Sequence, residues 1–303
     1  MSFHSINEHC YYYSGSVNIG YIHKGTDGLL IDAGLDRSSI KKVLKELNER
    51  ELPLTHLFIT HAHADHYGGA AYIQQNYDVY TIAPAFEEAV LKYPGLEPLY
   101  LFGGNDPLEE LQNKFLQGPA ITIDEVIEEG MFQAGAIEGK TYLLPGHSYH
   151  QLALRAHGIL YAADSYFGVD TLHKHKIPYN SDADRTLKSL NRLLTISCDG
   201  YVPGHGELEE DASATIQTNI DYHEDILDTM ENVIQAHEKG ISHEELVATM
   251  CDRYHVKAPQ LSQWLLYRTA VTAYAIALVK QGRAVHQIQD HRFVFTGLEA
   301  DQK

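Results

Sequence analysis

The stretch Thr60-His61-Ala62-His63-Ala64-Asp65-His66-Tyr67-Gly68-Gly69 decides the fold of this chain. It holds three histidines and one aspartate, and it directly follows the apolar run 57–59, which predicts a buried strand. Imidazole nitrogen and carboxylate oxygen without thiolate are typical ligands of a hydrolytic metal site rather than of a structural one. The first two histidines can point one way while the aspartate and the third histidine reach another. The spacing therefore predicts two adjacent metal ions.

This run resembles the T-H-x-H-x-D-H-x-G-G signature of the metallo-β-lactamase superfamily, and every fixed position is filled. Other segments that are similar to motifs of that superfamily follow its order along the chain: 29–34, 144–148, 160–164 and 201–206. One departure is Tyr149-His150, which stands where the family turn G-H-S-P-G-[HQ] has Pro-Gly, although Gln151 keeps the register. The resemblance covers roughly the first two-thirds of the chain.

The resemblance implies a ligand set for two ions, which we expect to be zinc, with iron or manganese as the alternatives at one or both positions. The implied ligands are His61, His63 and His147 for the first ion, Asp65, His66 and His205 for the second, and Asp164 as the bridge. A hydroxide held between the ions is then the nucleophile, because zinc lowers the pKa of bound water to about 7. Asp65 is implied as the catalytic residue that orients this hydroxide.

Three other positions carry expectations of their own. Asp32 ends an apolar strand, and we expect its carboxylate to accept hydrogen bonds near the metal loop rather than to bind metal. Tyr166 follows the bridging aspartate closely, so it is a candidate substrate-binding residue, with packing in the core as the alternative. His150 is expected behind the ligands or at the surface.

The expected architecture is a mixed α/β fold, the four-layer αββα sandwich of the family, followed by a C-terminal helical region. We place the catalytic domain at residues 1–212 and an accessory domain at 213–303, because helical periodicity dominates after the acidic segment 207–211. Three helices and a small hairpin are predicted in the accessory domain. They are compatible with a winged-helix-like module or with a plain helical cap.

Within the catalytic domain, helices are predicted over 36–51, 69–76 and 182–194, and strands over 120–124, 131–138 and 140–144. The segment 84–118 is irregular and rich in Gly and Pro. Long insertions of this kind often shape a substrate pocket. We therefore expect this segment to contribute to the pocket.

The chain carries 23 Lys and Arg against 41 Asp and Glu, a formal net charge of −18. This charge disfavours a nucleic-acid partner, because a polyanion is repelled unless a local basic patch exists. The three cysteines are odd in number and far apart, which argues against a disulfide framework and for a reducing cytoplasm. Neither a membrane-spanning run nor a signal-peptide pattern is apparent, so we expect no membrane association.

The function that we expect is hydrolysis of a small ester, thioester or lactone, as in the glyoxalase II-like branch that the motifs resemble. Single-strand-specific cleavage of RNA is the alternative, because a winged-helix-like tail occurs in one ribonuclease branch. A mono-iron persulfide dioxygenase shares the first three histidines and stays open. A flavodiiron oxidoreductase is disfavoured, since that branch has Glu at the position of His63. The partner is thus a small acyl molecule, and a homodimer is compatible with the sequence.

Overall fold

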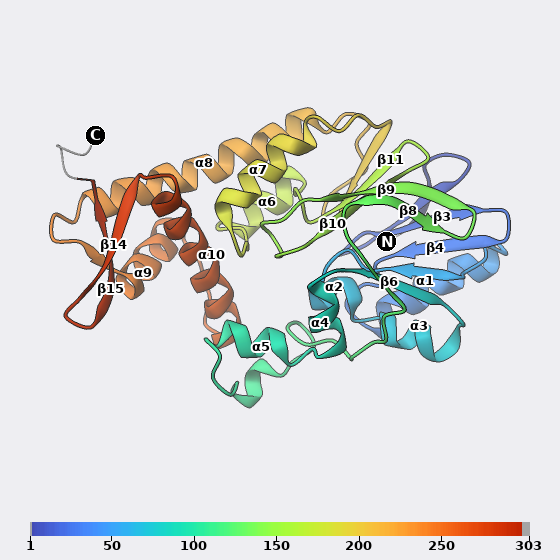
Figure 1. Ribbon diagram of the computed structural model, residues 1–303, viewed down its shortest axis with the longest axis horizontal. Coiled ribbons are helices and arrows are strands. Elements are labelled where there is room, and N and C mark those ends of the chain that lie inside the picture. The colour runs from blue at the N-terminus through green and yellow to red at the C-terminus, as the bar shows by residue number, and fades with distance from the viewer. Residues whose placement is uncertain (1, 299–303) are drawn as a thin grey trace.

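The computed structural model of this protein describes residues 2–298, which form two central sheets, the helices that cover them and a C-terminal module (Figure 1). The first sheet has seven strands in sequence order. Its strands are β1 (Ser2–Ser5), β2 (Cys10–Ser14), β3 (Ile19–Lys24), β4 (Asp27–Ile31), β5 (His56–Phe58), β6 (Tyr80–Pro84) and β7 (Glu125–Ile127). Strands β1 to β4 pair antiparallel, whereas β4 to β7 pair parallel. The parallel strands place their carboxyl ends at one edge, where the loop 59–69 begins.

The second sheet has five strands in the order β12-β11-β10-β9-β8. Its strands are β8 (Gly130–Ala134), β9 (Ile137–Leu143), β10 (Leu152–Ala156), β11 (Ile159–Ala163) and β12 (Gly200–Pro203). All neighbours pair antiparallel except β11 and β12, which are parallel. The connection from β9 to β10 therefore spans residues 144–151, and the connection from β11 to β12 spans residues 164–199.

The helices of the first two-thirds of the chain are mostly short. They are α1 (Arg37–Glu49), α2 (Ala64–Tyr67), α3 (Ala70–Asn76), α4 (Glu87–Lys92), α5 (Leu96–Leu101), α6 (Val169–His175) and α7 (Ala183–Leu193), with a 3-10 turn at Glu109–Leu111. Helix α1 begins where the sequence predicts, because the Asp36 side chain accepts hydrogen bonds from the backbone N–H groups of Ser38 and Ser39. Asp182 caps α7 in the same way through Arg185 N.

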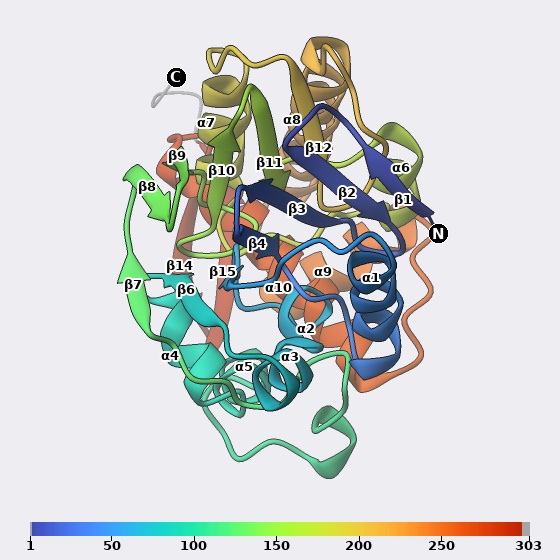
Figure 2. The ribbon, with the colours of Figure 1, turned by 90° about the vertical axis from the view of Figure 1, so that its right-hand side faces the viewer.

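The four layers arise because successive side chains of a strand face opposite sides of its sheet. Leu30 and Leu57 face α1 and α3 in one apolar cluster, whereas their neighbours Leu29 and Phe58 face the second sheet in another. On the far side of the second sheet, residues such as Leu160 pack against α7 and α8. Figure 2 shows the two sheets between α1 and α3 on one side and α7 and α8 on the other. The predicted αββα sandwich is confirmed.

Two strand predictions were wrong. The strand expected over 120–124 begins only at Glu125, because Thr122 N and Oγ1 donate to the Gln74 side chain instead of joining a strand ladder. The strand expected over 131–138 is broken at Gly135, whose φ of +58° forms the turn between β8 and β9.

The C-terminal region contains α8 (Ser213–Gln235), β13 (Ile241–Ser242), α9 (His243–Arg253), α10 (Leu261–Lys280), β14 (Ala284–Gln289) and β15 (Arg292–Gly297). The predicted hairpin is present as β14 and β15, and β13 adds a third strand to it. This order of a helix, a strand, two helices and a hairpin favours the winged-helix-like alternative. No helix within 2–298 is long and apolar enough to cross a membrane. The boundary near residue 212 stays a prediction.

Candidate metal centre

Four connections at the ends of strands bring the predicted ligands together. His61 and His63 lie in the loop after β5, and Asp65 and His66 lie on the short helix α2. From the second sheet, the segments after β9, β11 and β12 supply the other three: His147, Asp164 and His205. The structure thus gathers all seven predicted residues into one site, although they span residues 61 to 205.

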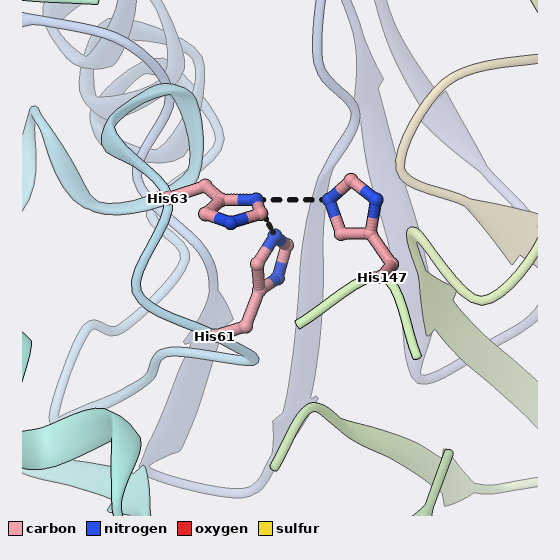
Figure 3. Close-up of side chains that lie close together, drawn as sticks. All are labelled: His61, His63 and His147. Atoms are coloured by element: carbon pink, nitrogen blue, oxygen red, sulfur yellow. Dashed lines mark hydrogen bonds between the residues drawn. The ribbon is translucent and has the colours of Figure 1, made fainter. Parts of the chain in front are cut away.

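The first group consists of His61, His63 and His147 (Figure 3). The Nδ1 atom of His63 lies 3.1 Å from Nε2 of His61 and 2.8 Å from Nε2 of His147. One ligand atom from each ring falls within 4.8 Å of the others. Nitrogen atoms of three histidines from two segments thus converge on one point, as the first ion requires.

The second group consists of Asp65, His66 and His205, and Asp164 lies between the two groups. Oδ1 of Asp164 is 3.2 Å from Nε2 of His66. Its Oδ2 is 3.2 Å from Nε2 of His147 and 3.4 Å from Nε2 of His205, which is itself 3.4 Å from Oδ2 of Asp65. One carboxylate therefore reaches histidines of both groups, which is the geometry of a bridging ligand.

The outward nitrogens of four histidines are held by neighbouring groups. Nδ1–H of His66 donates to Asp32 at 2.8 Å, that of His147 to the Tyr179 carbonyl at 3.1 Å, and that of His205 to the Ser16 carbonyl at 2.7 Å. The Nδ1–H of His61 donates to Thr60 Oγ1 at 3.0 Å, because the single hydrogen of that hydroxyl goes to Asp32. Partners of this kind fix the tautomer, so Nε2 of each ring is free for a cation.

Asp32 accepts hydrogen bonds beside the loop that carries the predicted ligands, as the sequence predicts. Its carboxylate accepts hydrogen bonds from Thr60 N at 2.8 Å, from Thr60 Oγ1 at 2.9 Å and from His66. These bonds hold the start of the metal loop and one of its histidines. Asp32 is absent from the converging ligand groups found among residues 2–298.

Burial and charge divide the site into two halves. Burial lowers the pKa of His61 well below its ordinary value and lowers those of His63 and His147 to about 4. Burial also acts against the charged form of His205, but Asp164 and Asp65 outweigh it and raise its pKa to about 10. The first half therefore presents neutral imidazoles, the form that binds metal, and the second half concentrates carboxylate charge.

The donor atoms fit divalent metal ions. His66 Nε2 and Asp164 Oδ1 are both buried and lie 3.2 Å from each other, and the rest of residues 2–298 supplies neither atom with a hydrogen bond. Buried polar atoms without partners are rare, so both are available to a cation. Gly204 leaves room for this arrangement, because a Cβ atom there would lie 2.0 Å from Asp164 Oδ1. A set of nitrogen and oxygen donors without sulfur suits zinc, iron or manganese.

The two groups open into one cavity of about 470 Å³. Its walls are largely apolar and come from the N-terminal region, the insertion 84–118, the segment after β11 and helix α10. They include Val17, Leu35, Phe115, Leu116, Phe167, Ile177, Leu266 and Tyr267. Lys257 is the one Lys or Arg among the lining residues within 2–298. The insertion therefore contributes to the cavity, as the sequence predicts.

Glu87 is a residue that the sequence analysis missed. Its buried carboxylate accepts hydrogen bonds from Ala62 N at 3.0 Å, from Ser148 Oγ at 2.5 Å and from His150 N at 2.8 Å. It therefore ties the loop that carries His61 and His63 to the turn that carries His147. In the sequence, Glu87 is one of two adjacent glutamates in an irregular segment, and nothing in that pattern distinguishes it.

Tyr166 and His150 lie outside the ligand groups. Tyr166 is buried in the apolar cluster beneath the second sheet, and Phe167 faces the cavity instead. This placement favours the packing role for Tyr166. His150 is half-buried, stacks on Tyr149 and contributes only its backbone N–H to the Glu87 network.

Comparisons with known proteins agree with this geometry. The family model of the Metallo-beta-lactamase superfamily matches residues 12–205. An atrochrysone carboxyl ACP thioesterase from Aspergillus fumigatus is 22% identical over 198 residues, which is 65% of this chain and 53% of that protein. A hydroxyacylglutathione hydrolase from Bradyrhizobium sp. is 31% identical over 112 residues, covering 37% of this chain and 42% of that enzyme.

A solved structure extends the likeness to nearly the whole chain. A beta-lactamase domain protein from Burkholderia ambifaria superposes with a TM-score of 0.74 at 17% identity, covering 98% of this chain and 94% of that one. At this identity the likeness concerns the fold alone. The chain spans about half the length of the fungal relatives that it matches, 53% for the thioesterase.

Proposed function

Because the chain belongs to the metallo-β-lactamase superfamily, we propose that it is a hydrolase with a dinuclear zinc site that cleaves a small ester, thioester or lactone. The observation that carries this proposal is the shared position of Asp164 between two groups of ligand atoms at an apolar cavity. The thioesterase and hydroxyacylglutathione hydrolase relatives support an acyl substrate, and the second of them supports the glyoxalase II-like branch.

His61, His63 and His147 would hold one ion, Asp65, His66 and His205 the other, and Asp164 would bridge them. Bound ions would supply Lewis acidity, which acidifies a water molecule and polarises the scissile carbonyl. The chain's own groups do the rest. The pKa of Asp65 is lowered because His66 and His205 outweigh its burial, so its carboxylate is ionised and can orient a proton of the attacking water. The apolar walls of the cavity bind the acyl body and exclude bulk solvent.

Charge supports an acyl substrate over RNA. A second groove of about 730 Å³ between α10 and the C-terminal hairpin contains Arg268, Lys280 and Arg292. However, Lys280 pairs with Asp182 at 2.7 Å and Arg268 lies 3.7 Å from Glu244. Cations that are already paired with carboxylates neutralise few phosphates. Together with the net charge of −18, this groove offers little of the attraction that a polyanion requires.

A panel assay tests the proposal. The full chain, loaded with zinc, is offered thioesters, aryl esters, lactones and a labelled single-stranded RNA while the salt concentration is varied. We expect chelator-sensitive turnover of an acyl substrate with little dependence of kcat/KM on salt. Cleavage of RNA alone, suppressed about 10³-fold or more between low and moderate salt, would favour the ribonuclease alternative. Elemental analysis of the purified protein distinguishes zinc from iron, and a mono-iron protein would favour persulfide oxidation.

A further inference from the structure

Glu97 is a buried acidic residue of the metal-site cavity that is not among the predicted metal ligands. It lies on α5, within the insertion 84–118, and is only 4% exposed. Its Oε2 atom is buried without a hydrogen-bond partner among residues 2–298. A buried carboxyl group without a partner costs folding free energy, and such groups are therefore rare. A carboxyl group of this kind in a cavity wall is therefore open to a partner that enters the cavity.

The surroundings of Glu97 favour the protonated acid. Burial is the main cause that raises its pKa well above the ordinary value, and the carboxylate of Glu87 acts in the same direction. Tyr67 and Tyr179 lie near it as well: burial is the main cause that raises their pKa values, and Glu97 in its ionised form would raise them further. The Tyr67 hydroxyl already accepts a hydrogen bond from Gly118 N at 2.9 Å. A protonated carboxyl group can donate one hydrogen bond, which an ionised one cannot.

Glu97 shares the cavity with the metal ligands but belongs to a different element. His63, Asp65, His147, Asp164 and His205 all line the same cavity. The proposed reaction places the scissile carbonyl at these ligands. A donor on α5 therefore meets another part of a substrate whose scissile bond is at the metal site.

We propose that Glu97 contacts the substrate and donates a hydrogen bond to a second oxygen atom, such as a hydroxyl or keto oxygen on the acyl chain. This inference rests on the proposed hydrolase function and narrows its substrate class to oxygenated acyl esters or thioesters. The apolar walls suit the carbon chain of such a substrate, and the single donor selects for its second oxygen.

The test compares two probes that differ by one hydroxyl group, the N-acetylcysteamine thioesters of β-hydroxybutyrate and butyrate. We expect wild-type protein to prefer the hydroxylated probe by about tenfold in kcat/KM, mainly through KM, because one neutral hydrogen bond is added. Glu97→Met has similar bulk but no donor, so it should lose the preference and still hydrolyse the butyryl probe. Glu97→Gln keeps an N–H donor and should keep part of the preference.

Stability separates this role from a structural one. Because Oε2 has no partner to lose, Glu97→Met should unfold at the same temperature as wild type or higher. Its zinc content should also be unchanged. If Glu97 has only a structural role, Glu97→Met should have a lower Tm and an equal loss of kcat/KM for both probes. Glu109→Met replaces an exposed glutamate of the same insertion, outside the cavity lining, and should change neither the preference nor the metal content.

A binding measurement keeps the test independent of turnover. In the thioether analogues of both probes a methylene group replaces the scissile carbonyl, so they bind without reacting. Calorimetry on the zinc-loaded protein should show about tenfold tighter binding of the hydroxylated analogue by wild type and equal binding by Glu97→Met. Equal binding by wild type, or a preference that survives in Glu97→Met, would overturn the inference. Failure of wild type to hydrolyse any acyl probe would count against the proposed function instead.

Discussion

Replacing Glu87 should uncouple the two loops that carry the first three histidines. Glu87 Oε2 accepts from the N–H of Ala62, which lies between His61 and His63. Its Oε1 accepts from Ser148, which follows His147, and from the N–H of His150. Its position is fixed by an uncommon backbone conformation, since Phe86 directly before it has a φ of +73°. One buried carboxylate thus sets the spacing of the first ligand group.

The expected loss of stability follows from the hydrogen-bond donors that lose Glu87 as their acceptor. Glu87→Ala leaves two backbone N–H groups without partners, whereas the Ser148 hydroxyl can rotate to another acceptor. An unsatisfied buried donor costs about 1–3 kcal/mol, so the free energy of unfolding should fall by about 2–6 kcal/mol. We expect the lower half of that range, because Glu87 lines a small cavity of about 260 Å³ that can admit water to the exposed donors. Glu87→Gln keeps one acceptor oxygen and should lose about 1–3 kcal/mol.

Metal binding should suffer as well. Removing a group that orients metal ligands typically costs 10–100-fold in metal affinity or activity. The assay measures zinc affinity by competition with a chelator and the free energy of unfolding by denaturant titration, each with and without metal. The matched control is Glu88→Ala, which removes the neighbouring, partly exposed carboxylate. If Glu87→Ala keeps wild-type metal affinity and unfolds like the control, the bridging role assigned to Glu87 is wrong.

Three further changes have defined outcomes. Asp164→Asn should lower the metal content of the second position most, measured by elemental analysis, because a neutral amide bridges two cations poorly; full occupancy would argue against a bridge. Burial lowers the pKa of His223 to about 4, so this histidine should contribute a loss of stability of up to about 3 kcal/mol as pH drops from about 6.5 towards 4, and His223→Gln should make the slope in denaturant titrations shallower by that amount. Asp36→Ala should cost about 1 kcal/mol at neutral pH through the lost α1 cap. Lys114 and Ser39 lower the pKa of Asp36 to about 2, so this cost should shrink as pH falls below 4 towards 2, and a cost independent of pH would contradict it.

The sequence predicted the parts of the site that are encoded locally. His61, His63, Asp65 and His66 lie within one run, and the other predicted ligands each follow closely after a recognisable apolar strand. The role of Asp32 was predictable for the same reason, since strands β4 and β5 pair in parallel and end together. Helix α1 was predictable to within two residues, because both its cap and its apolar face are local features.

The remaining parts depend on contacts between distant segments. The Ser16 carbonyl that holds His205 is 189 positions away along the chain, and Glu87 lies 61 positions from Ser148. Ser16 and Tyr179 hold His205 and His147 through their backbone carbonyl groups, so the type of side chain at these positions does not predict the contact. Glu97 lies in a segment whose Gly and Pro residues interrupt any hydrophobic periodicity that would predict a helix or a strand. The roles of these residues can be recognised only in the folded structure, where the distant segments are in contact.

The C-terminal module connects to the catalytic centre through the segment after β11. Asn219 on α8 accepts a hydrogen bond from Phe167 N at 3.0 Å and donates to the Phe167 carbonyl at 2.8 Å. Tyr267 on α10 donates to the carbonyl of His175 at 3.2 Å. Phe167, His175 and Tyr267 all line the cavity, as does Lys257 before α10. The predicted metal ligands therefore all lie in the sandwich, whereas residues from both the sandwich and the C-terminal module line the cavity. We therefore expect substrate selection to depend on the contact between the sandwich and the C-terminal module.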